Sequence, residues 1–143
     1  MRASHLLVFS ACLSLTGCQT DTILGFAVGD ISGLWVASSY VYSDASSGEG
    51  SVDLVARDGA MFTAVVDYGP RPPIISITFD DGAGMEISGG GTVDIRLGTL
   101  TIEGDVFDIV ATEVEMTLTG GAMMYDFGSG ARAAVLTIRL RRL

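Results

Sequence analysis

The stretch AVLTIRLR at residues 134–141 carries the pattern that decides the fold. Its even-numbered positions hold alanine, leucine, isoleucine and leucine, and its odd-numbered positions hold valine, threonine and two arginines. Alternation with a period of two gives a β-strand one apolar face and one largely polar face. We therefore expect this stretch to be a half-buried strand of an antiparallel sheet.

The same alternation recurs along the chain from Gly33 onward. No window holds a helical apolar stripe over three turns, and no segment offers the long crossover that parallel strands need. We expect about 8–10 short strands joined by tight turns. The sequence predicts one all-β domain, a single antiparallel up-and-down β-barrel, with a β-sandwich as the alternative. The clearest alternating runs are residues 52–57, 61–68, 74–79, 92–97, 100–103 and 114–118.

Glycine marks the expected turns between these runs. Asp58-Gly59 predicts a hairpin turn of type I′, and Asp80-Asp81-Gly82 predicts a second turn. The glycine groups at 89–91, 120–121 and 128–130 lack the lysine that ends a phosphate-binding loop. They are interpreted as turns too.

A short apolar run, Leu6–Leu15, follows the single basic residue Arg2 near the start of the chain. A positive residue, an apolar run and then small residues form the pattern of a secretory signal. A membrane-spanning helix needs about 20 apolar residues, twice what this run supplies. A buried N-terminal helix is the other alternative, but small and polar residues at 16–21 end it abruptly.

The run ends in Leu15-Thr16-Gly17-Cys18, which resembles the lipobox of bacterial lipoproteins. The resemblance implies that residues 1–17 are a signal peptide and that Cys18 becomes the first residue of the mature chain. It also implies that lipid on Cys18 anchors the protein to a membrane of the bacterial cell envelope. Gln19 stands where an aspartate would resemble an inner-membrane retention signal, which favours the outer membrane, on its periplasmic or surface face. Residues 18–30 are then a lipidated tether, and residues 31–143 form the barrel domain.

Removal of residues 1–17 would change the chemistry of the chain. His5 is the only histidine, Cys12 leaves with it, and the chain has no lysine. The mature chain would lack an imidazole, a free thiol and a side-chain amine, which excludes Ser-His-Asp triads, Cys/His zinc sites and Schiff-base catalysis. We predict no cofactor and no metal, and only a hydrolase built from carboxylates stays open as an enzyme.

Acidic residues dominate the charge. Without Arg2 the chain keeps seven basic residues against seventeen acidic ones, a net charge of −10. Nucleic-acid binding needs clustered lysine and arginine, so nucleic acid is excluded as a partner. The acidity itself is typical of a solvated surface.

Gly33-Leu34-Trp35 opens the first expected strand of the domain, and arginines stand near the end of the last one. This combination resembles the lipocalin-like (calycin) barrels. In that family the tryptophan closes one end of the barrel and an arginine of the final strand packs across its ring. The resemblance implies Trp35 paired with Arg139, or with Arg141 on the same strand face. We expect no counterpart here of the C-terminal helix usual in the family.

The inward face of such a barrel would present a set of large apolar side chains. They either line a cavity for a small apolar ligand or form an ordinary packed core. Tyr40 and Tyr42, or residues 123–125, are further candidates for the rim of an opening. The candidate cavity residues are Phe62, Ile75, Ile77, Phe79, Ile95 and Met116.

Three carboxylates, Asp80, Asp81 and Glu86, lie close together in the sequence. A hard cation such as Ca²⁺ would need about six to eight oxygen ligands, and the spacing does not match an EF-hand loop. Asp-Gly is first of all a turn former. The turn is therefore the preferred interpretation.

Three functions follow from these observations. The first is an envelope lipoprotein whose lipid-anchored β-barrel binds or carries a small apolar ligand, an expectation that rests on fold analogy. The alternative is a structural or assembly lipoprotein that acts through its surface and has no ligand cavity. The third is the carboxylate-only hydrolase.

Overall fold

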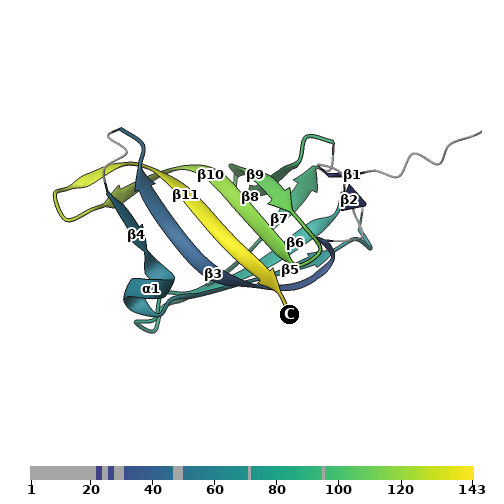
Figure 1. The fold of residues 1–143 in the computed structure, drawn as a ribbon, viewed down its shortest axis with the longest axis horizontal. Coiled ribbons are helices and arrows are strands. Elements are labelled where there is room, and N and C mark those ends of the chain that lie inside the picture. Colours follow the sequence, from purple (N-terminus) through teal and green to yellow (C-terminus); the bar gives the residue numbers. More distant parts are fainter. Residues whose placement is uncertain (1–21, 24–25, 28–30, 47–49, 71, 95) are drawn as a thin grey trace, which may run out of the picture.

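The computed structural model describes residues 22–23, 26–27, 31–46, 50–70, 72–94 and 96–143. Within these residues the protein is almost entirely β-structure, with one short helix (Figure 1). The elements in chain order are β1 (Thr22–Ile23), β2 (Phe26–Ala27), β3 (Gly33–Asp44), β4 (Ser51–Asp53), α1 (Leu54–Asp58), β5 (Met61–Asp67), β6 (Ile74–Asp80), β7 (Glu86–Asp94), β8 (Thr99–Ile102), β9 (Asp105–Ala111), β10 (Glu115–Asp126) and β11 (Ala131–Arg142).

Eight of these strands form a closed antiparallel barrel. Their order is β3, β5, β6, β7, β8, β9, β10 and β11, and β11 pairs back onto β3 to close the sheet. Consecutive barrel strands are neighbours, so the topology is up-and-down. The predicted barrel of about 8–10 strands is confirmed, and the sandwich alternative is wrong.

The core fills the inside of this barrel, and the alternating pattern selects its residues. In β11 the even-numbered positions Ala134, Leu136, Ile138 and Leu140 are buried, whereas Arg139 and Arg141 are exposed. The other strands add further apolar side chains that point inward, as expected for a barrel whose interior side chains alternate with exterior ones. The largest fully buried side chains are Trp35, Ile31, Ile75, Leu100, Met116, Leu118, Leu136, Ile138 and Leu140.

The prediction of a single strand over residues 52–57 is wrong, because α1 begins at Leu54. The Asp53 carboxylate accepts a hydrogen bond from the Val55 N–H at 3.0 Å and so caps the start of the helix. Gly59 ends the helix with φ of 70° and ψ of 22°, the left-handed conformation typical of a C-terminal helix cap. Asp58-Gly59 is therefore a helix end rather than a hairpin turn.

Two of the three glycine groups were also wrongly predicted to be turns. Residues 89–91 lie within β7, where a Cβ at Gly91 would collide with the backbone carbonyl oxygen of Thr101 in β8. Residues 120–121 form a β-bulge inside β10, at the point where the pairing with β11 shifts its register. The glycine group at 128–130 does form the turn between β10 and β11.

The N-terminal part is described over two short strands. β1 and β2 pair antiparallel, with Thr22 opposite Ala27, inside the segment predicted to be a tether. Cys18 and the apolar run Leu6–Leu15 lie outside the described residues. Among the helices in the described part of the chain, none has the length and apolar character needed to cross a membrane.

Candidate functional site

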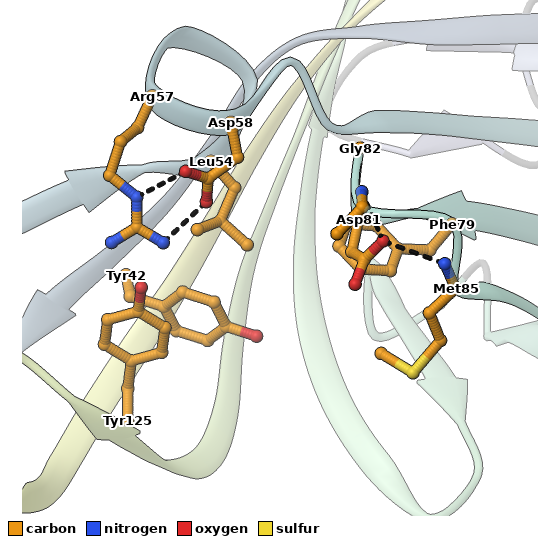
Figure 2. Close-up of a pocket in the computed structure, with 10 residues that line it drawn as sticks. Tyr42, Leu54, Arg57, Asp58, Phe79, Asp81, Gly82, Met85 and Tyr125 are labelled. Atoms are coloured by element: carbon orange, nitrogen blue, oxygen red, sulfur yellow. Dashed lines mark hydrogen bonds and ion pairs between the residues drawn. The ribbon is translucent and has the colours of Figure 1, made fainter.

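A pocket of about 540 Å³ lies beside Tyr42, near the end of β3, whereas Trp35 lies near the start of the same strand. Figure 2 shows the residues that line it. We call it the end pocket. Its walls come from β3, α1, the end of β6, the β6–β7 turn and β10. The lining residues are Tyr42, Leu54, Arg57, Asp58, Phe79, Asp81, Gly82, Ala83, Met85 and Tyr125.

α1 and the β6–β7 turn form two sides of the end pocket. The Asp81 carboxylate organises the turn by accepting hydrogen bonds from the backbone N–H groups of Ala83 at 2.8 Å and Met85 at 3.0 Å. Gly82 has a φ of 77°, and a Cβ there would collide with the backbone carbonyl oxygen of Asp58 at the end of α1. Glycine therefore meets both demands of this position, the backbone conformation and the close approach to the helix.

A row of aromatic rings forms one wall and continues toward the core. Tyr42 stacks on Tyr125 with the ring centroids 4.3 Å apart and the planes 13° from parallel. Tyr40 meets the Tyr42 ring at 5.6 Å and the Phe79 ring at 5.0 Å. Burial raises the pKa of the Tyr40 phenol well above its ordinary value, and neighbouring Tyr42 adds to the shift. The base of this wall is therefore aromatic and uncharged.

The charged groups of the end pocket lie at its exposed edge. The Arg57 guanidinium donates to Asp58 through Nε at 2.7 Å and through Nη2 at 2.5 Å. This hydrogen bonding lowers the pKa of the Asp58 carboxyl and, with a smaller contribution from Tyr125, raises the pKa of Arg57. In Figure 2 the Tyr125 hydroxyl points toward this ion pair. The rim of the end pocket therefore carries an ion pair, Arg57–Asp58, with the Tyr125 hydroxyl beside it.

The two carboxylates of the end pocket are not arranged for acid catalysis. A carboxyl that donates a proton near neutral pH needs a raised pKa. The pKa of Asp58 is lowered by Arg57, and the pKa of Asp81 is lowered by the backbone N–H groups of Met85 and Ala83. Among the described residues, no group of three or more His, Cys, Asp and Glu side chains is placed to hold a metal ion.

Five of the six residues predicted to line a ligand cavity are described, and Ile95 lies outside the described residues. All five belong to the packed interior or contact it, and Phe79 also lines the end pocket. Two of the further rim candidates, Tyr42 and Tyr125, line the end pocket as well. The buried members of the five are Phe62, Ile75 and Met116, and the partly buried members are Ile77 and Phe79.

Trp35 is fully buried at the other end of the barrel. The arginine that packs on its ring is not the one predicted from the sequence. The Arg142 guanidinium carbon lies 4.9 Å from the centre of the Trp35 ring. Arg139 and Arg141 occupy odd-numbered positions of β11 and point outward, whereas Arg142 follows Leu140 on the inward-facing side. The pairing of Trp35 with Arg139 is therefore wrong, and strand parity is the physical reason.

Replacement of Arg142 by alanine should lower the stability of the protein and change the environment of Trp35. The variant loses the cation–π contact and the cover that the arginine stem gives the ring, at a cost of about 1–2 kcal/mol in the free energy of unfolding. Trp35 is the only tryptophan, so its fluorescence emission should shift to longer wavelength as water reaches the ring. Arg139→Ala is the matched control and should change neither quantity. Equal effects of the two substitutions would contradict the assignment.

Most residues of the end pocket were not expected from the sequence to line a cavity. Leu54, Arg57 and Asp58 lie on α1, which the period-two pattern concealed, and Met85 lies in a turn. A sequence signal for α1 does exist, since an aspartate cap at 53 and a glycine at 59 bracket one helical turn.

Comparison with known protein families, curated proteins and solved structures finds no match for this chain.

Proposed function

We propose that this protein is an envelope lipoprotein, anchored by lipid on Cys18, whose barrel binds a small apolar molecule in the end pocket. The observation that carries the binding proposal is the pocket itself, an aromatic and aliphatic hollow of about 540 Å³. Small-molecule sites usually measure about 300–1,000 Å³ and combine an apolar lining with a few polar groups. The anchor is supported by the lipobox-like sequence that ends at Cys18.

The lining indicates the polarity of the molecule that would bind. Leu54, Phe79 and Met85 offer apolar surface, and the stacked rings of Tyr42 and Tyr125 offer a flat wall. Charged groups lie on two sides: Arg57 and Asp58 neutralise each other on the α1 side, and the Asp81 carboxylate on the β6–β7 turn accepts hydrogen bonds from backbone N–H groups. A ligand with an apolar body and a small polar end directed toward α1 would satisfy this arrangement.

The second candidate, a structural or assembly lipoprotein that acts through its surface, is favoured by a different observation. Phe62, Ile75 and Met116, which were candidates for a cavity, are packed into the core. Several large apolar side chains also lie exposed on the outside of the barrel, among them Val110 and Leu143. The two candidates differ in whether the end pocket holds a ligand.

Substitution of Met85 tests the end pocket directly. Met85 is 54% exposed, so arginine can replace it without disturbing the core. The probe is N-phenyl-1-naphthylamine, an uncharged fluorescent molecule with an apolar body and one small polar group, so that the introduced arginine cannot attract it by charge. Saturable binding to the unaltered protein and a loss of about tenfold in affinity for Met85→Arg are expected.

Met61→Arg is the matched control, because Met61 is 60% exposed on β5 and does not line the end pocket. Its affinity should equal that of the unaltered protein. Native mass spectrometry of the protein purified from its own envelope should also find a retained small molecule. Failure of the probe to bind, or binding that Met85→Arg leaves unchanged, would favour the surface-acting candidate.

A further inference from the structure

Four strands continue the barrel wall beyond its closed part. Residues 41–43 of β3 pair with β4, residues 134–136 of β11 pair with β3, and residues 122–126 of β10 pair with β11. We call the paired segments 122–126 and 131–135 the arm. In Figure 1 the turn of the arm projects past the end of the barrel. The outermost strands of this extension are β4 and β10.

The arm has one strand edge without a partner among the described strands. β9 pairs with β10 only over residues 116–120, and the bulge at 120–121 ends that pairing. Segment 122–126 of β10 is therefore hydrogen-bonded to β11 on one side and to no described strand on the other. A strand edge of this kind presents a row of backbone N–H and C=O groups that can pair with another chain.

The other open edges of the sheet are protected. β4 is three residues long and leads directly into α1. β7 pairs with β8 only from residue 91 onward, but its free stretch starts with Glu86, and the Glu103 carboxylate approaches Gly89. Short edge strands and charged side chains are the usual means of blocking strand addition. The free β10 edge, residues 122–126, is longer than β4, and its one charged residue, Asp126, stands at its far end.

An uncharged pocket of about 430 Å³ lies against the arm. Glycine, alanine, valine and methionine line it, and the methionines are flexible enough to fit side chains of several shapes. Met124 on the edge segment is 67% exposed. The lining residues are Ala45, Gly120, Gly121, Met123, Met124, Ala133, Ala134 and Val135.

We propose that the β10 edge at residues 122–126 is a strand-addition site for an extended, uncharged segment of a partner protein. In strand addition the main-chain hydrogen bonds supply affinity, and side-chain pockets beside the edge supply specificity. A polypeptide backbone has donors and acceptors at the spacing of the edge, which a lipid or a small apolar molecule lacks. A pocket without charge, on a protein of net charge −9, selects a partner residue that is apolar rather than acidic. The proposal does not depend on the end pocket being occupied.

Synthetic heptapeptides test the edge on the purified protein. The set alternates threonine with one apolar residue type, carries blocked termini and has no charge. Saturable binding of at least one peptide is expected, with slowed hydrogen exchange at amides of residues 122–126. Met124→Lys should weaken that binding by about tenfold or more, whereas Met61→Lys should leave it unchanged.

Two controls separate strand addition from other contacts. A peptide with the same side chains but alternate backbone nitrogens methylated on the pairing edge should lose binding, because it cannot donate to β10. Equal binding of the methylated peptide, protection outside residues 122–126, or no binding of any peptide at about 1 mM would overturn the proposal. A dimer of this chain that Met124→Lys dissociates would also overturn it, because a second copy would then be the occupant.

Discussion

Trp35→Ala is expected to lower the free energy of unfolding by about 3–5 kcal/mol, the usual cost of removing a large aromatic side chain from a core. Trp35 is 0% exposed, so the substitution leaves a large cavity in the core. Two polar consequences add to the cavity. The backbone carbonyl of Ile31 loses the hydrogen bond donated by Nε1 at 2.9 Å, and the charge of Arg142 loses the ring beneath it.

The loss is larger because, among the described residues, two of the three guanidinium nitrogens of Arg142 have no hydrogen bond to replace the ring. Its Nε and Nη2 atoms are buried and have no hydrogen-bond partner within the described part of the chain. A buried cation without a compensating contact is costly. Chemical denaturation followed by circular dichroism measures the effect without needing the tryptophan. Leu34→Ala, on the exposed face of the same strand, is the control and should cost well under half as much.

Cys18→Ser is expected to move the protein from the washed membrane fraction to the soluble fraction and to abolish labelling by a palmitate analogue. Each buried methylene of an acyl chain contributes about 0.8 kcal/mol to membrane binding, so loss of two or more chains removes nearly all of it. The apolar run Leu6–Leu15 cannot replace them, because a span needs about twice its length.

Cys12→Ser is the matched control for this experiment. Both substitutions exchange a thiol for a hydroxyl, but Cys12 lies inside the predicted signal peptide. Its variant should keep the membrane fraction and the label unchanged. A native protein that begins at Met1 with an unmodified thiol at position 18 would refute the anchor and restore His5 and Cys12 as candidates for chemistry.

The barrel could be predicted because a period of two is a local signal with a global consequence. The pattern of residues 134–141 predicts which side chains of β11 are buried, and a similar pattern does the same for β5. The same alternation also identifies the arginine that packs on Trp35. Arg142 continues the even-numbered buried series, whereas the predicted Arg139 does not.

Glycine was harder to interpret, because its role depends on what the fold places beside it. Gly91 is needed where β8 passes close to β7, and Gly120 is part of a bulge, yet both resemble turn residues when seen alone. The end pocket was hidden for a similar reason. Leu54 and Met85 become neighbours only after α1 and the β6–β7 turn meet at Gly82, a contact that no local pattern encodes.

The pairing of β3 with β11 has a consequence for synthesis. These are the first and last strands of the barrel, so its final seam joins residues from nearly opposite ends of the domain, such as Trp35 and Arg142. Contacts between distant parts of a chain form late and slow folding. The ribosome must therefore release almost the whole polypeptide before the barrel can close. Until then one edge of β3 lacks its partner β11. A chain cut short by a premature stop codon would keep that edge open, and an open strand edge favours aggregation.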